Sequence, residues 1–327
     1  MTTTAPAPGT VDRPRTLPRR LVGRVAVAAG QLVAVSVIVF ALTAALPGDT
    51  AEVVLGQQAT PEQVAALRAQ LGLDRPVLLR FADWVGGVLT GDPGRSLVTG
   101  VPVADELAGR LASTASVAGL ALLVIVPVAL AAGVTAGRRP GSVTDRVITA
   151  VATAGQAIPE FASGLVLVAV FAVTLGWLPA TAGGGSFTGP AVLVLPVVVL
   201  ALNQVGRLAR QIRIGVVETE RAEYVVHLRR LGMGERTLLL RHVLPGALPP
   251  TVQQLARVVD GLLGGVVVVE ALFALPGVGA GFVEAVQGRD LPLVQGYALL
   301  FATTTVVVNL LADLVSDRLA PHREALR

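Results

Sequence analysis

The chain alternates between long apolar runs and short segments rich in arginine. Val25–Leu46 is the first apolar run and carries no charged residue. At 1.5 Å per residue, a helix over this range spans a hydrocarbon core about 30 Å thick. Five further apolar runs follow, at Leu111–Gly137, Phe161–Leu178, Pro190–Val205, Val252–Leu275 and Leu293–Val315. The pattern predicts an all-α membrane protein with six transmembrane helices.

A short segment precedes the first apolar run, and another follows the last one. Residues 1–24 are rich in proline, threonine and arginine and predict a disordered tail, and residues 320–327 form a second tail. A secretory signal peptide is the alternative explanation for the first run. The run is longer than the apolar stretch of a typical signal, which has about 7–15 residues. A first transmembrane helix over residues 25–46 is therefore the favoured interpretation.

A polar insertion separates the first two spans. Residues 47–110 contain Asp and Glu throughout and predict a small extracytoplasmic region. Within it, Thr60 is a good N-cap for a short helix. The amphipathic stretch Val77–Leu89 predicts a second helix that lies along the membrane surface, with Phe81 and Trp84 facing inward.

The stretch Val143–Leu178 is about 36 residues long, which is too long for one straight span. Proline removes a helical hydrogen bond and clashes with the preceding turn, so Pro159 interrupts this stretch. We expect a helix on the cytosolic side that ends at Ile158, followed by the third span.

The positions of the arginines predict the orientation. Nineteen of the 26 basic residues fall in segments that are cytosolic if the N-terminus is cytosolic, and six fall outside. The remaining one, Arg257, lies near the fifth span. Cytosolic loops carry the excess of basic residues in membrane proteins, so both termini are expected in the cytosol. This placement also explains the net charge of +4 without nucleic acid as a partner.

Composition excludes several classes of function. The chain is 53% hydrophobic and only 15% charged, against about 25% charged in soluble domains. All its basic residues except three histidines are arginine, and a P-loop needs a lysine to reach the phosphates of a nucleotide, so the chain is no P-loop ATPase. Absence of cysteine excludes disulfides and thiolate metal sites. No zinc-protease or serine-hydrolase motif is present, so we expect neither catalytic nor metal-binding residues.

The stretch from Glu220 to Pro250 predicts a short basic helix between two spans. Tyr224, Leu228 and Leu231 recur at helical spacing and fall on one face. Gly232 stands where a helix C-cap is expected, after arginines in the last turn. Such a one-sided helix suits the groove of a partner protein; the alternative is an ordinary solvated loop.

Polar residues inside predicted spans are the other candidate site. Arg257 and Asp260 stand three residues apart, which allows them to pair on one helix face. Glu270 lies further along the same span, and Asn309 toward the inner end of the sixth span. Such residues are functional candidates by default; the alternative role is adhesion between helices by buried hydrogen bonds.

The Glu220–Pro250 stretch resembles the cytosolic motif of bacterial ATP-binding cassette (ABC) importer permeases, E-A-A-x-x-x-G, nine residues, then I-x-L-P. Gly232 is followed after nine residues by His242-Val243-Leu244-Pro245. Val226, His227 and Leu228 depart from the Glu and two small residues of the motif, and His242 replaces Ile. Other segments resemble the peptide and nickel subgroup in its order: Leu46-Pro47-Gly48-Asp49, Gly91–Ser96, Ile158–Phe161, Glu270–Gly279, Arg289–Pro292 and Asn309–Asp313.

This resemblance implies a permease subunit of an ATP-driven importer in the bacterial cytoplasmic membrane. Residues 111–319 are then the permease core, with a cytosolic coupling loop over 212–250. The resemblance implies as partners two ATPase subunits that hold ATP and magnesium, a different second permease, an extracytoplasmic solute-binding protein and membrane lipid; this chain itself binds no cofactor. The residues it assigns to ATPase coupling are Glu223, Tyr224, His227, Leu228, Arg229, Gly232, Leu244 and Pro245.

Peptides are the expected cargo, and nickel chelates and glutathione are the alternatives. An ion-coupled secondary transporter is the competing class. That class requires internal repeats and an ion site near the membrane midplane, and Asp260 is the one carboxylate placed near mid-span.

Overall fold

The computed structural model describes residues 17–45, 50–56, 59–70, 72–183 and 189–319. In these residues the fold is all-helical, apart from one isolated bridge between Arg95 and Pro102. The α-helices are α1 (Leu17–Ala44), α2 (Thr50–Leu55), α3 (Pro61–Gln70), α4 (Val77–Thr90), α5 (Val103–Arg138), α6 (Val143–Ala157), α7 (Glu160–Leu167), α8 (Val194–Glu220), α9 (Glu223–Arg230), α10 (Glu235–Leu238), α11 (Leu244–Phe273), α12 (Val278–Gln287) and α13 (Leu291–Leu319). A π-helical stretch, Val168–Thr174, continues α7, a 3₁₀ turn, Pro190–Leu193, precedes α8, and a second π-helical stretch, Leu239–Val243, joins α10 to α11.

Four helices are long and apolar enough to cross a membrane: Val22–Ala44, Val103–Arg138, Pro190–Glu220 and Leu291–Ser316. Two bent pairs raise the number to six if each pair is one span. Val143–Ala157 and Glu160–Thr174 meet at 100°, and Glu235–Phe273 and Val278–Gln287 meet at 76°. The all-helical, multi-pass fold predicted from the apolar runs is confirmed.

Several helix ends differ from the prediction. Helix α1 begins at Leu17, inside the predicted tail, and α5 begins at Val103 rather than Leu111. Helix α8 continues past Val205 to Glu220, so that the first part of the predicted 212–250 loop is helical. A change from apolar to basic residues does not end a helix, because arginine is a good helix former. Helix α12 follows a Pro-Gly pair and was not predicted.

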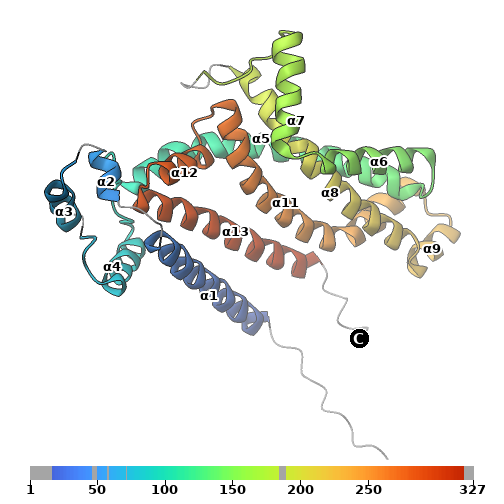
Figure 1. Cartoon of the computed structure of the whole chain (residues 1–327). Helices are drawn as coiled ribbons and strands as arrows, with labels where there is room; N and C mark the ends of the chain where they lie inside the picture. Colours follow the sequence, from blue (N-terminus) through green and yellow to red (C-terminus); the bar gives the residue numbers. More distant parts are fainter. Residues whose placement is uncertain (1–16, 46–49, 57–58, 71, 184–188, 320–327) are drawn as a thin grey trace, which may run out of the picture.

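The long helices lie side by side, with α2–α4 at one end of the bundle and α9 at the other (Figure 1). The most extensive packing between two helices joins α5 to α8. A Cβ at Gly133 of α5 would lie 2.6 Å from the carbonyl oxygen of Ala209, and one at Gly137 would lie 2.8 Å from the Val216 side chain. These two glycines, four residues apart, let the two backbones approach closely, as small residues do in membrane bundles.

The polar insertion is folded against the ends of α1 and α13. Thr60 and Gln63 cap α3 reciprocally, as the sequence predicted for Thr60. The rings of Phe81 and Trp84 of α4 stand 5.2 and 5.9 Å from that of Phe40 of α1. The inward orientation predicted for both aromatic residues is confirmed. The Leu46–Asp49 motif falls outside the described residues.

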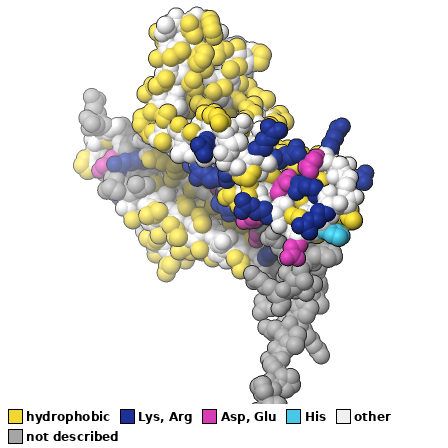
Figure 2. Space-filling model, turned by 90° about the vertical axis from the view of Figure 1, so that its right-hand side faces the viewer, with side chains coloured by type: hydrophobic (Ala, Val, Ile, Leu, Met, Phe, Trp, Pro, Cys, Tyr) yellow, Lys and Arg dark blue, Asp and Glu magenta, His cyan; other side chains and the backbone are white. Residues whose placement is uncertain are grey.

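The break predicted at Pro159 is confirmed as the 100° bend between α6 and α7. Helix α7 projects away from the long helices, toward the top of Figure 1. Its side chains Leu165 and Val166 are more than half exposed, as is Val173 in the π-helical stretch. Figure 2 shows apolar side chains gathered on this projecting part, so that its surface suits a lipid environment or another apolar surface.

Candidate functional site

Helix α9 owes its sharp end to Gly232. The amide of Met233 donates to the carbonyl of Leu228 at 3.2 Å, and the amide of Gly232 donates to that of Arg229 at 3.1 Å. Gly232 has φ +85°, in the left-handed region. These are the bonds and conformation of a Schellman C-cap, which favours glycine. The cap predicted at Gly232 lies where the sequence placed it.

One side of α9 is anchored to the rest of the chain and the other is exposed. Val225 is fully buried, and Leu228 packs against the same apolar core as Leu238 and Val243. Tyr224 and Leu231 are 50% and 70% exposed. Leu228, which the spacing places on the same face as this pair, is partly buried against the core, whereas His227 is exposed like Tyr224 and Leu231.

The later part of the predicted coupling motif lies beside Tyr224. The Tyr224 and His242 rings stand 6.5 Å apart, edge to face, and the Tyr224 hydroxyl donates to the His242 carbonyl at 3.5 Å. Leu244 and Pro245 open α11 instead of forming a loop, since proline is well tolerated in the first turn of a helix. Pro245 is exposed, at the same end of the molecule as α9.

Four charged side chains fasten α9 to its neighbours. Arg229 donates to Glu235 of α10 at 2.7 Å and to Glu220 of α8 at 2.5 Å. Arg138, at the end of α5, lies 3.2 Å from Glu235 and 4.0 Å from Glu220. The hydrogen bonds to these two carboxylates raise the pKa of Arg229 above its ordinary value. Figure 2 shows this end of the bundle, where arginine side chains gather.

A second ion pair holds α6 against α8. Arg213 binds Asp145 with two nitrogens, at 2.5 and 2.7 Å, and Asp145 also accepts the Gly141 amide at 2.8 Å. Sequence reasoning missed this pair, although Asp145 is the one acidic residue of α6. A lone carboxylate on an apolar helix was the available signal.

The pairing expected between Arg257 and Asp260 is wrong. In the described structure no ion pair joins the two; Arg257 donates to Gln254 at 2.9 Å, and Asp260 accepts the Asn309 amide at 3.1 Å. A spacing of three residues shows which side chains share a helix face, but not which neighbouring helix is closer. Asp260 and Asn309 therefore join α11 to α13, as does the bond from Gln253 to Asp313.

Glu270 is fully buried, and its carboxylate holds the start of α12. It accepts the amides of Gly279 and Ala280 at 2.7 and 3.1 Å and the Thr114 hydroxyl at 2.6 Å. A Cβ at Gly277 would collide with this carboxylate. The site matches the preference of acidic groups for helix N-termini, and it explains why glycines follow Glu270 at this spacing.

The Asp290 carboxylate likewise accepts hydrogen bonds from another segment, in this case the insertion. It accepts the Ser96 hydroxyl and the amides of Leu97 and Val98, the latter two at 3.2 and 3.3 Å. Two of the motifs named separately in the sequence, Gly91–Ser96 and Arg289–Pro292, therefore meet in space. Their contact spans 194 residues of sequence, and no local pattern indicates it.

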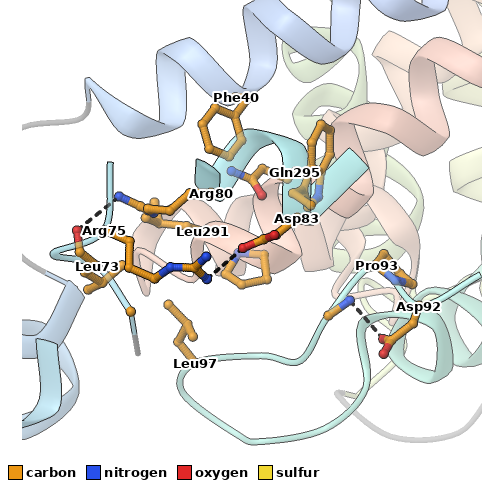
Figure 3. Close-up of a pocket in the computed structure, with 14 residues that line it drawn as sticks. Phe40, Leu73, Arg75, Arg80, Asp83, Asp92, Pro93, Leu97, Leu291 and Gln295 are labelled. Atoms are coloured by element: carbon orange, nitrogen blue, oxygen red, sulfur yellow. Dashed lines mark hydrogen bonds and ion pairs between the residues drawn. The ribbon is translucent and has the colours of Figure 1, made fainter. Parts of the chain in front are cut away.

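A cavity of about 260 Å³ lies beside this contact, between the insertion and the ends of α1 and α13. Figure 3 shows Arg75 paired with Asp83, at 2.7 Å, and Arg80 directed at the carbonyl of Leu73. Burial and the charge of Arg68 lower the pKa of Arg80. Among the residues described here, no cluster of His, Asp and Glu could hold a metal ion.

The sequence matches known transport proteins over almost its whole length. Residues 128–324 match a family described as the binding-protein-dependent transport system inner membrane component, and residues 17–118 match its N-terminal region. The chain is 36% identical over 297 residues to a peptide transport system permease protein of Brucella abortus, with 89% of this chain and 94% of the relative covered. It is 34% identical over 287 residues to the glutathione transport system permease protein GsiC of Escherichia coli, with 88% and 92% covered.

The chain therefore belongs to the family of binding-protein-dependent transport system inner membrane components. It is a multi-pass permease subunit of an ABC importer, and its resemblance to the peptide and nickel subgroup is confirmed. A further relative, a peptide ABC transporter permease protein of Sinorhizobium fredii, is 34% identical over 308 residues, with 93% of this chain and 97% of the relative covered.

Proposed function

We propose that α9 is the helix through which this permease receives the work of ATP hydrolysis. The observation that carries the proposal is the division of α9 into a buried side, with Val225, and an exposed side, with Tyr224 and Leu231. A helix rooted in the bundle by one face and free on the other transmits a push from a partner. A helix of an ordinary solvated loop has no reason to bury a valine completely.

The partners follow from this assignment. Two ATPase subunits hold ATP and magnesium and carry out the hydrolysis, since this chain has no lysine for a P-loop. A second, different permease completes the pathway, and this chain needs no cofactor of its own. A solute-binding protein approaches the α2–α4 end, where the cavity of Figure 3 opens. The complex belongs in the cytoplasmic membrane of a bacterium, with both termini of this chain in the cytosol.

Peptides are the proposed cargo. Relatives from Brucella abortus and Sinorhizobium fredii are named as peptide transport permeases. The name of GsiC makes glutathione, itself a small peptide, the second candidate, and nickel chelates are the third. The solute-binding protein, which meets the cargo first, is the direct place to measure the choice.

The test replaces each of two glycines in the same loop by proline, in separate variants. Gly232→Pro cannot keep φ +85°, because proline fixes φ near −65°. We expect this variant to insert into the membrane but to lose ATPase co-purification and transport, as we expect for deletion of residues 223–232. Gly234→Pro is the matched control: Gly234 has φ −62°, and no described atom lies within 4 Å of an added Cβ. Retained ATPase binding in Gly232→Pro would contradict the docking role.

The competing class needs a separate measurement. The purified chain, placed alone in liposomes without ATP, should move no peptide. Uptake driven by a proton or sodium gradient under these conditions would support a secondary transporter and would direct attention to Asp260.

A further inference from the structure

We propose that Arg229 is a positioning residue, which fixes the orientation of α9 on the inner ends of α5 and α8 so that movement of α9 is passed to both helices. The proposal rests on the proposed function, in which α9 receives the push of the ATPase. It gives Arg229 a role within the chain, instead of the contact with the ATPase that the resemblance implied.

The geometry of the charge network supports this role. Arg229 uses two of its nitrogens on two different carboxylates, Glu220 at the end of α8 and Glu235 at the start of α10. A planar guanidinium held at two points fixes direction as well as distance. Its side chain is 36% exposed and that of Glu220 is 20% exposed, so water screens this contact only in part.

The backbone links on either side of α9 do not by themselves fix its orientation. On one side, only Arg221 and Ala222 separate α9 from α8. On the other side, the link to α10 contains Gly232 and Gly234. The buried Val225 holds α9 against the bundle, but an apolar contact has no preferred direction. The charge network, together with the bond from Tyr224 to His242, therefore sets the angle at which α9 lies.

The network also reaches the second long helix. Arg138, the last residue of α5, shares the two carboxylates with Arg229. Helices α5 and α8 are already packed closely at Gly133 and Gly137. A push on α9 is therefore received by a pair of packed helices at their inner ends, and not by the α8 terminus alone.

The experiment compares Arg229→Gln with Arg236→Gln. Arg236 is an exposed arginine of α10, and no ion pair of Arg236 is found in the described residues, so its loss removes the same charge without touching the network. In the reconstituted complex, we expect Arg229→Gln to keep ATPase co-purification and ATP hydrolysis. We expect the amount of peptide moved per ATP to fall by about fivefold, the lower end of coupling between sites. Arg236→Gln should keep the normal ratio.

A distance measurement reads the orientation directly. Because the chain has no cysteine, spin labels can be attached at Arg139→Cys, beyond α5, and Arg230→Cys, on α9, with no other change. The distribution of distances between them should be narrow in the otherwise unaltered chain and in Arg236→Gln. It should broaden in Arg229→Gln.

The outcomes separate the proposals. A narrow distribution and a normal transport ratio in Arg229→Gln would overturn the positioning role. A narrow distribution combined with loss of ATPase co-purification would also overturn the positioning role. That result would make Arg229 a contact with the ATPase, and it would leave the proposed function of α9 intact. If no ATPase co-purifies even with the unaltered chain, the proposed function fails; the spin-label distances need no ATPase and still decide whether the network orients α9.

Discussion

At the scale of single residues, the buried carboxylates of this permease act as structural ligands for backbone amides. Glu270 binds the first turn of α12, and Asp290 binds the loop after Ser96. Both are acids inside or beside membrane helices, which makes them candidates for the transport of charge. Their bonds instead account for them as parts of the scaffold, so the polar residue most open to a functional test is Asp260.

Asp260 and Asn309 form the pair that links α11 to α13, and their substitutions should follow this contact. Asp260→Asn keeps an oxygen for the Asn309 amide and should lower the free energy of unfolding by less than about 1 kcal/mol. Asp260→Leu leaves the amide with one partner fewer and should cost about 1–3 kcal/mol. Thermal unfolding of the purified protein in detergent measures both values.

Arg257→Gln is the control for this series. Arg257 is exposed and bonded to Gln254 on its own helix, so its loss should change stability by less than about 0.5 kcal/mol. A loss from Arg257→Gln as large as that from Asp260→Leu would contradict this assignment, and non-additive losses in the double variant would show that the two residues are coupled.

These residues show what the sequence can and cannot predict about the site. The cap at Gly232 was predictable because a C-cap depends on neighbours within six residues. The partner of Asp260 was not, because it lies 49 residues away on another helix. The Arg229 network was hidden for the same reason: Arg138 reaches Glu235 across 97 residues.

At the scale of elements, the packing of α5 on α8 depends on glycines, which have no side chain at the contact. Gly133→Ala would place a Cβ 2.6 Å from the Ala209 carbonyl oxygen and 2.7 Å from the Ile212 Cβ. We expect a loss of about 1–3 kcal/mol, as for other overpacked sites, measured by thermal unfolding in detergent.

Gly119→Ala makes the same exchange elsewhere on α5. No described atom lies within 4 Å of a Cβ at this position, and alanine is a better helix former than glycine. Stability should therefore stay the same or rise slightly. Equal losses at positions 119 and 133 would mean that helix formation, and not contact with α8, decides the cost.

The spans themselves were predictable, whereas their ends were not. Apolar runs long enough to cross the membrane are visible in sequence because the bilayer imposes their length. The ends of α8 and the start of α12 depend on other forces. Helix α8 extends into the polar region because nothing in residues 206–220 interrupts it. Helix α12 starts after Gly277 because Glu270, on another helix, supplies partners for its first amides.

At the scale of the whole molecule, the two ends of the bundle differ in kind. One end bears α9 and the arginines seen in Figure 2, and the other bears the insertion α2–α4 (Figure 1). Because basic residues are retained in the cytosol, we expect α9 inside the cell and α3 outside.

Thiol labelling tests this orientation in a chain without native cysteine. Ala65→Cys on α3 should react with a membrane-impermeant maleimide when the cytoplasmic membrane is intact. Arg236→Cys on α10 should react only after the membrane is disrupted; both positions are exposed. The reverse pattern would contradict the orientation and, with it, the docking of a cytosolic ATPase at α9.

The bond between Ser96 and Asp290 has a consequence for how the protein is made. The two residues leave the ribosome 194 residues apart. At a translation rate of about 5–20 residues per second, Ser96 waits about 10–40 s for its partner. Until then the bond to Asp290 cannot form, whereas the contact of α4 with α1 can. The α2–α4 end of the bundle is thus completed last, just before the final helix is made. With the orientation expected above, a nascent chain that stalls before residue 290 should expose an insertion that lacks this bond to extracytoplasmic proteases.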